Sequence, residues 1–416
     1  MRVDALDGVD VQKPERPALL VIAGVTGAFA ASNVMRGGIR LATSLIVARG
    51  LGGAGFGRWV FCAAWAGTLT SVLDLGFGAL LTRDAARNRN VSGLVSRAFI
   101  ARAAAFVPVA AVFLIAAPLV RGAADVDALR AAVPLAGTSI AYGCIAAVFR
   151  GWPDRLLWIL GLETAGALVQ AGLSWLLIRH GAGVAALLWL AAAVQAAQLA
   201  AAMAVLMAVR GAEDRFEWPR VTLVAGAVRR SMPFALTGLV ASAQNRIAPL
   251  LLGYMSGAAE VASFGAAWRL GNAARAVPSA AFAGALPVLT ARAGRADASA
   301  RSSFHRALRL FTIAASATLA LLSPIIVRWT YGSGFSGAVI PLVCVAAGLV
   351  PSLLNASRRV YLYAERREAV ALRWSAAALA IQIAACALLI PRWGAEGAAI
   401  GLLAGEAAVW WPLSRA

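Results

Sequence analysis

Long apolar runs recur at short, regular intervals along the whole chain, and this pattern limits it to one class of fold. Most of the runs reach the about 20 residues that a helix needs to cross the hydrocarbon core of a bilayer. Such runs form helices in lipid, because lipid offers no partner for an unpaired backbone amide. With 61% hydrophobic and only 14% charged residues, the chain is too apolar for a soluble globular protein. We predict an all-α polytopic membrane protein with about twelve transmembrane helices, at 20–48, 56–80, 99–121, 128–150, 156–178, 184–208, 229–255, 262–288, 307–330, 336–354, 371–391 and 395–413.

The net charge of +19 is explained by where the arginines lie. Twenty-two arginines fall in alternate connections between the predicted spans, whereas the remaining connections carry seven. This alternation is the positive-inside pattern, in which the basic loops face the cytoplasm. It predicts that both termini are cytoplasmic and that the basic charge mainly sets topology, with contact to anionic headgroups as a second role. We therefore expect membrane lipid as a partner, and no nucleic acid.

The chain divides into two similar halves. Residues 209–228 form the most polar stretch near its middle, so we predict a cytoplasmic tail at 1–17, a six-helix lobe at 18–208, a cytoplasmic linker at 209–228 and a second six-helix lobe at 229–416. The segment from Arg40 to Val47 matches the segment from Arg246 to Gly253 at a constant offset of 206 residues. Six helices followed by six in the same orientation indicate a parallel pseudo-twofold repeat, a design found in secondary transporters. The architecture therefore predicts alternating access.

Short motifs in both halves share their order with one known family. They are Arg49-Gly50-Leu51-Gly52 with Phe56-Gly57, Asp74-Leu75-Gly76 with Arg83, Arg246 to Tyr254, Gly265 to Leu270, Pro278-Ser-Ala, Pro287-Val-Leu, and Ile390-Pro391 with Gly394 and Gly397. This set resembles the polysaccharide transporter family, the O-antigen and exopolysaccharide flippases. The family belongs to a superfamily that also holds the multidrug and toxin extruders (MATE) and the peptidoglycan lipid flippase.

The resemblance carries expectations about fold, substrate and location. It implies a MATE-like fold in the bacterial inner membrane. It also implies a flippase that moves undecaprenyl-diphosphate-linked oligosaccharide from the inner to the outer leaflet for surface polysaccharide synthesis. The implied partners are the polyprenyl-diphosphate-linked glycan and, in the same process, polysaccharide polymerase or chain-length proteins.

Arginines inside the predicted spans are the main candidates for a substrate site. Arg40 and Arg246 occupy matching positions of the repeat. At 1.5 Å per residue, Arg269 lies about 10 Å and Arg275 about 20 Å along the eighth span, which places Arg269 near the depth of Arg40. Guanidinium groups there are suited to holding a diphosphate through paired, charge-assisted hydrogen bonds. Arg36 shares a helix face with Arg40 but matches Ser242 in the repeat, so snorkelling to the headgroups is its alternative.

Other polar residues in the spans are weaker candidates. Gln244 and Asn245 adjoin Arg246, so we expect them in the cavity wall, although such amides more often join helices. Three carboxylates, Asp74, Glu163 and Glu406, are candidates for coupling to a proton or cation, or for ion pairs with neighbouring arginines.

An enzyme reading finds little support in the sequence. The only lysine is Lys13, so a Walker A motif, and with it direct ATP hydrolysis, is excluded. We expect no catalytic residues, no metal and no cofactor. The first alternative to a flippase is a multidrug extruder of the same fold, whose cationic substrates require carboxylates rather than arginines in the cavity. A membrane-embedded polysaccharide-processing enzyme is a remote third.

Overall fold

The computed structural model describes residues 16–88, 92–120, 122–209, 221–291, 298–364 and 367–415. These residues form helices and no strand, which confirms the predicted all-α class. The helices are α1 (Arg16–Asp74), α2 (Phe77–Arg87), α3 (Ser92–Ala116), α4 (Val126–Gly151), α5 (Leu156–Arg179), α6 (Val184–Val209), α7 (Val221–Met255), α8 (Ala258–Ala291), α9 (Ala298–Leu321), α10 (Ser323–Thr330), α11 (Val339–Ala364) and α12 (Glu368–Arg415), with short 3-10 helices η1 (Ala117–Leu119), η2 (Pro153–Arg155) and η3 (Ser333–Ala338).

Two glycines divide the longest helices. Gly52 in α1 has φ 68° and ψ −178°, and Gly394 in α12 has φ 49° and ψ −124°. Glycine adopts positive φ at little cost, so each residue reverses the chain within what would otherwise be one helix. The span predicted at 20–48 therefore lies on the first segment of α1, and the span predicted at 56–80 covers the second segment and the start of α2. The expected loop between the two spans is replaced by a much tighter break. The spans predicted at 371–391 and 395–413 share α12 in the same way.

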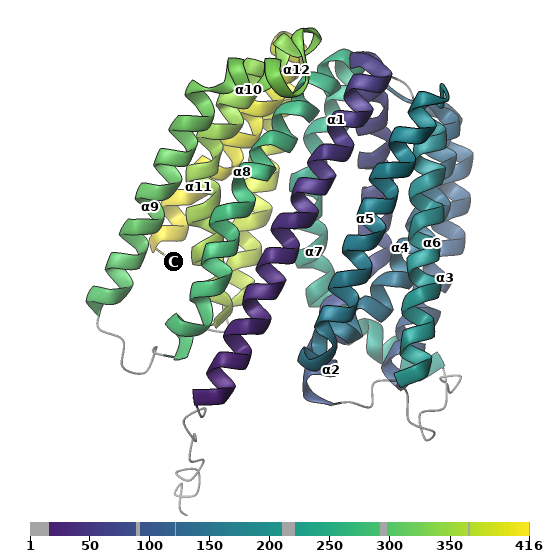
Figure 1. Cartoon of the computed structure of the whole chain (residues 1–416), viewed down its shortest axis with the longest axis vertical. Coiled ribbons are helices and arrows are strands. Elements are labelled where there is room, and N and C mark those ends of the chain that lie inside the picture. Colours follow the sequence, from purple (N-terminus) through teal and green to yellow (C-terminus); the bar gives the residue numbers. More distant parts are fainter. Residues whose placement is uncertain are drawn as a thin grey trace, which may run out of the picture.

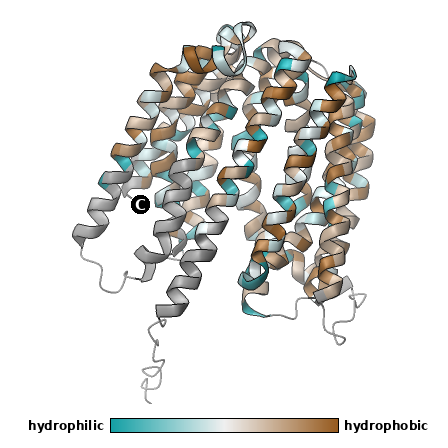
Figure 2. Cartoon of the chain, in the orientation of Figure 1, coloured by the Kyte–Doolittle hydropathy of each residue, from teal (hydrophilic) through white to brown (hydrophobic). Residues whose placement is uncertain are grey.

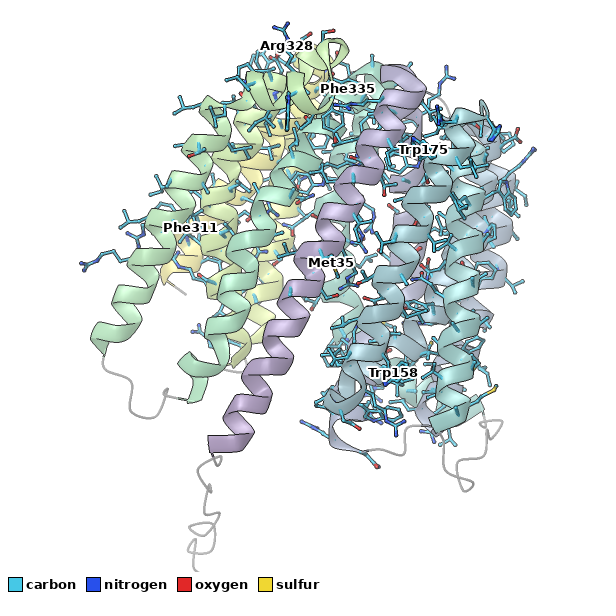
Figure 3. The ribbon with its side chains drawn as sticks, in the orientation of Figure 1. Met35, Trp158, Trp175, Phe311, Arg328 and Phe335 are labelled. Atoms are coloured by element: carbon cyan, nitrogen blue, oxygen red, sulfur yellow. The ribbon has the colours of Figure 1, made fainter. Side chains whose placement is uncertain are left out.

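The surface of the helices is that of a membrane protein. Among the described helices, six are long and apolar enough to cross a membrane, and up to eight if each of two bent pairs forms one span. Brown, apolar ribbon dominates α3–α6 (Figure 2), and exposed large side chains there and on α9 include Trp158, Trp175 and Phe311 (Figure 3). A soluble protein rarely exposes so much apolar surface, and lipid accounts for it. The chain is thus a multi-pass membrane protein.

The helices form two groups with α1 running between them (Figure 1). The first group holds α3–α6 and the second holds α8–α12. α1 packs against α8 on one side and against α4 and α5 on the other, while α7 packs against α12 and α1. The predicted tail and linker fall mostly outside the described residues, at 1–15 and 210–220.

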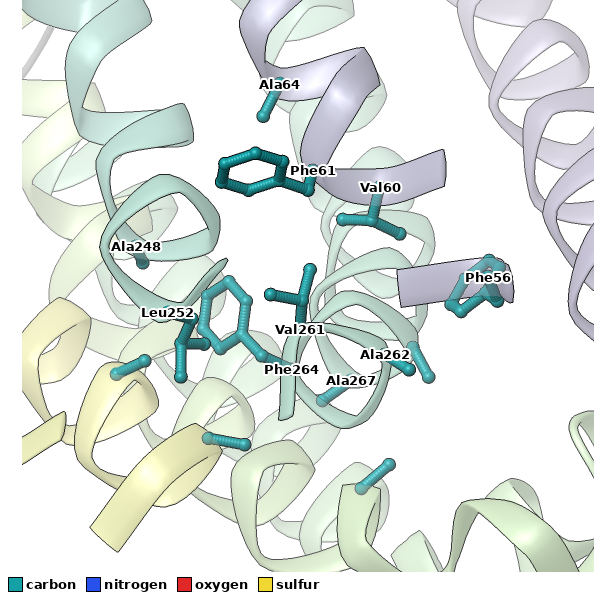
Figure 4. Close-up of a cluster of buried hydrophobic side chains, with 14 of the residues drawn as sticks. Phe56, Val60, Phe61, Ala64, Ala248, Leu252, Val261, Ala262, Phe264 and Ala267 are labelled. Atoms are coloured by element: carbon teal, nitrogen blue, oxygen red, sulfur yellow. The ribbon is translucent and has the colours of Figure 1, made fainter. Parts of the chain in front are cut away.

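A buried apolar cluster joins α1 to α7 and α8 close to the break at Gly52 (Figure 4). Phe56 and Phe61 of α1 and Phe264 of α8 are fully or almost fully buried there. A Cβ atom at Gly57 would overlap the backbone carbonyl of Ala258, so glycine permits this close approach of the two helices. The cluster fixes the segments of α1, α7 and α8 that carry the polar residues described next.

Candidate functional site

One cavity lies between α1, α7 and α8, and we call it the arginine cavity. Its volume is about 630 Å³, within the range of about 300–1,000 Å³ that is usual for ligand pockets. Arg40 of α1, Arg246 of α7 and Arg269 of α8 all line it, although they come from both halves of the chain. No carboxylate lies among its described lining residues. The rest of its wall is formed by Gly37, Leu41, Val60, Ala63, Ala64, Asn245, Pro249, Trp268, Asn272 and Ala273.

The three arginines are held in different ways. The guanidinium of Arg246 donates to the Ser242 hydroxyl and, at 3.2 Å, to the Ser71 hydroxyl. Arg269 lies over the Trp59 ring, with Cζ 4.8 Å from its centroid, and donates to the Gly265 carbonyl at 3.2 Å. Arg40 is exposed to the cavity and has no ion-pair partner in the described part of the chain. None of these contacts neutralises the positive charge of the site.

A second cavity, which we call the amide cavity, adjoins the first. It has a volume of about 440 Å³ and lies between α1, α4, α5 and α6. Arg40 and Arg269 line both cavities and thus form their shared wall. The other polar lining residues are Arg36, Thr43, Trp59, Tyr142, Arg150, Glu163, Gln170, Gln195 and Gln198.

Glu163 of α5 is the only carboxylate among the described lining residues of the two cavities, and two arginines pair with it. Its carboxylate binds Arg36 of α1 and Arg150 of α4. Glu163 is 8% exposed and Arg36 12%, whereas Arg150 is 41% exposed. Arg36 therefore faces the amide cavity instead of reaching for the headgroups, which was its alternative. Glu163 serves as an ion-pair partner in this structure.

Four of the expected site residues are not among the described lining residues of either cavity: Gln244, Arg275, Glu406 and Asp74. Gln244 donates to the Ser375 carbonyl at 3.3 Å, so its amide joins α7 to α12. Asn245 does line the arginine cavity. The guanidinium of Arg275 lies over the ring of Trp268, 5.3 Å from its centroid; Trp268 lines the arginine cavity, whereas Arg275 itself is not among the lining residues. Glu406 accepts from Asn355 at 2.8 Å and from Arg359 at 3.3 Å, an interhelical contact between α12 and α11.

Asp74 also lies apart from the cavities, at the bend between α1 and α2. Its carboxylate pairs with Arg102 of α3, which is 2% exposed. Arg102 also donates to the Asp74 carbonyl and to the Ile140 carbonyl, both at 3.0 Å, and to Cys144 Sγ at 2.8 Å. Leu75 and Gly76 follow with φ of 50° and 72°, and α2 leaves at 52° to α1. Arg102 thus stabilises the bend between α1 and α2.

Sequence reasoning missed three residues that the fold makes important. By sequence, Arg102 and Arg150 belong to the twenty-two arginines of the basic connections, because each lies near the end of an apolar run, yet both pair with carboxylates of other helices. Tyr142 has no signal in the sequence, because a single tyrosine in a membrane span is common. The available signal was Glu163, since a carboxylate in a membrane span requires a partner.

A family profile described as polysaccharide biosynthesis protein matches residues 25–292 of the chain. No curated protein matches the sequence. In the described residues, no group of three or more His, Cys, Asp or Glu side chains is placed to hold a metal ion.

Solved structures of transporters share the fold. The lipid II flippase MurJ, in an inward closed conformation, superposes with a TM-score of 0.74 at 11% identity, covering 94% of this chain and 86% of that one. A MATE structure in complex with MaL6 gives a TM-score of 0.65 at 16% identity, covering 94% of each chain. A MOP superfamily transporter from Pyrococcus furiosus, described as having a binding pocket of reverse polarity, gives 0.59 at 14% identity and 94% coverage of each. At these identities the likeness establishes the fold alone, and it confirms the predicted MATE-like class.

Proposed function

The chain belongs to the polysaccharide biosynthesis protein family, and from this premise we propose that it is a flippase for an undecaprenyl-diphosphate-linked oligosaccharide. The glycan would cross the membrane by alternating access while its polyprenyl tail stays in lipid. Both the family and the fold of MurJ and MATE transporters support a transport role over an enzymatic one.

One observation carries the proposal: Arg40, Arg246 and Arg269 line a single cavity whose described wall holds no carboxylate. Guanidinium groups bind phosphate oxygens through paired, charge-assisted hydrogen bonds. Cations within a membrane span are costly, so three of them around one space suit an anionic ligand. The diphosphate is the anionic group that every lipid-linked oligosaccharide of this class carries.

The same charge argues against a multidrug extruder. A cationic drug would meet three arginines in one cavity and four in the other, where a single carboxylate is already paired. The polysaccharide-processing enzyme remains the weaker alternative, because the described cavity residues include no acid–base pair free to react.

The remaining features of the proposal follow from the sequence. We place the chain in the bacterial inner membrane with both termini in the cytoplasm, and we assign residues 18–208 and 229–416 to the two moving lobes. Coupling to a proton or cation would use Glu163, which lines the amide cavity, rather than Asp74 or Glu406, which line neither cavity. Polymerase or chain-length proteins would receive the product on the outer face.

The proposal is tested by complementation in a host strain that lacks its own copy of the gene. We expect Arg40→Ala and Arg246→Ala to reduce surface polysaccharide about tenfold or more, since a hydrogen bond to a charged group contributes about 1.5–3 kcal/mol. Arg179→Ala is the matched control, because Arg179 is exposed at the end of α5 and lines neither cavity. Protein levels are measured by immunoblot. Normal polysaccharide in the Arg40→Ala and Arg246→Ala strains, at normal protein level, would refute the site.

A further inference from the structure

The amide cavity contains buried polar atoms that lack a partner. Tyr142 Oη of α4 and Gln195 Nε2 of α6 are inaccessible and have no hydrogen-bond partner in the described structure. Both side chains line the cavity, and Tyr142 is 7% exposed. More than 90% of buried polar groups in proteins are hydrogen-bonded, so two orphan groups around one space indicate a ligand that supplies their partners.

The charged groups of this cavity fall into two sets. Glu163 pairs with Arg36 and Arg150, so these three groups compensate one another in part. Arg40 and Arg269, which pair with no carboxylate among the described residues, lie at the wall shared with the arginine cavity. The uncharged polar groups of the lining are the hydroxyls of Thr43 and Tyr142 and the amides of Gln170, Gln195 and Gln198.

Amides and hydroxyls suit one class of ligand. A sugar carries hydroxyl groups that both donate and accept hydrogen bonds, and it presents more of them per unit volume than a lipid or a drug. Tyr142 Oη donates or accepts, and Gln195 Nε2 donates. The ring of Trp59 is also in this wall, with the guanidinium of Arg269 over it.

We propose that the amide cavity is the glycan subsite, in which Tyr142 and Gln195 bind the sugars next to the diphosphate. The diphosphate itself occupies the arginine cavity and its wall at Arg40 and Arg269. This division rests on the proposed function and goes beyond it, because it assigns the diphosphate to the arginine cavity and the sugars to the amide cavity.

The test uses the purified full-length protein and native mass spectrometry with two probes. One probe is undecaprenyl diphosphate, and the other is the same lipid carrying a single N-acetylhexosamine. We expect the wild type to bind the sugar-bearing probe about fivefold or more tightly than the bare lipid, as two additional hydrogen bonds allow. Tyr142→Phe and Gln195→Leu should reduce the ratio of the two affinities toward one, while the affinity for the bare lipid stays within about twofold of the wild-type value.

Two comparisons separate the possible outcomes. Arg246→Ala should weaken both probes alike, because it acts on the diphosphate. Tyr254→Phe is the matched control, since Tyr254 lines neither cavity, and it should change nothing. Equal binding of the two probes by wild type, or equal loss for both probes in Tyr142→Phe and Gln195→Leu, would overturn the subsite while leaving the flippase proposal standing. Failure of the wild type to bind either probe would overturn both.

Discussion

Arg36 of α1 and Glu163 of α5 form an ion pair in the wall of the amide cavity, and both side chains are largely withdrawn from solvent. Arg150 of α4 reaches the same carboxylate from a more exposed position. A single carboxylate thus ties α1 to two other helices of its half at the edge of the proposed substrate site. Movement of α1 therefore either breaks this pair or carries α5 with it.

We expect the two ion pairs of Glu163 to differ in strength. Double-mutant cycles with Glu163→Gln should give a coupling energy of about 1–3 kcal/mol for Arg36→Gln and less than about 1 kcal/mol for Arg150→Gln. The difference follows from exposure, because solvent screens Arg150 more than Arg36. Equilibrium unfolding in mixed detergent measures it. Equal couplings would contradict this assignment.

Adding a single methyl group beside Arg246 tests whether its guanidinium binds the ligand. A Cβ atom at Gly67 would overlap Nε of Arg246, so Gly67→Ala should displace the guanidinium from its place between Ser71 and Ser242. We expect the affinity for undecaprenyl diphosphate to fall about threefold to tenfold, as for the loss of one net hydrogen bond. Gly172→Ala is the control, because nothing lies within 4 Å of the added atom. An unchanged affinity in Gly67→Ala would show that Arg246 does not contact the ligand.

Arg102 should be essential for stability and not for binding. It is buried and contacts the Asp74 carboxylate and carbonyl, the Ile140 carbonyl and Cys144. Arg102→Met leaves these acceptors unpaired and should lower the free energy of unfolding by about 3 kcal/mol or more. Arg130→Ala, which breaks the exposed pair with Asp127, should cost less than about 1 kcal/mol. Thermal unfolding in detergent measures both; similar midpoints for the two variants would contradict the role given to Arg102.

The sequence predicted the fold well because the constraint is strong. Lipid forces each long apolar run into a helix, and the motifs from Arg49 to Gly397 carried the superfamily fold. The repeat offset also paired Arg40 with Arg246, and the two residues line one cavity. The composition of the apolar runs and their regular spacing along the chain are sufficient to identify such spans.

The site was only partly predictable because it depends on which face of each helix turns inward. Gln244 and Asn245 are neighbours in sequence, but one turns toward α12 and the other toward the arginine cavity. Arg275 was placed by depth alone, and its contact with Trp268 depends on rotation about the α8 axis. Arg150 and Tyr142 needed the packing of α4 against α1 and α5 before their role was apparent.

The central claim is that the arginine cavity carries the diphosphate of a lipid-linked sugar across the membrane. Its most direct test is a translocation assay in proteoliposomes, with undecaprenyl-diphosphate-linked N-acetylhexosamine in both leaflets and an impermeant reagent that modifies the exposed sugar. Wild-type protein should make the inner-leaflet pool accessible. A triple variant with Arg40→Gln, Arg246→Gln and Arg269→Gln, shown to be folded by its thermal unfolding, should leave that pool protected. Translocation by the triple variant at the wild-type rate would contradict the account.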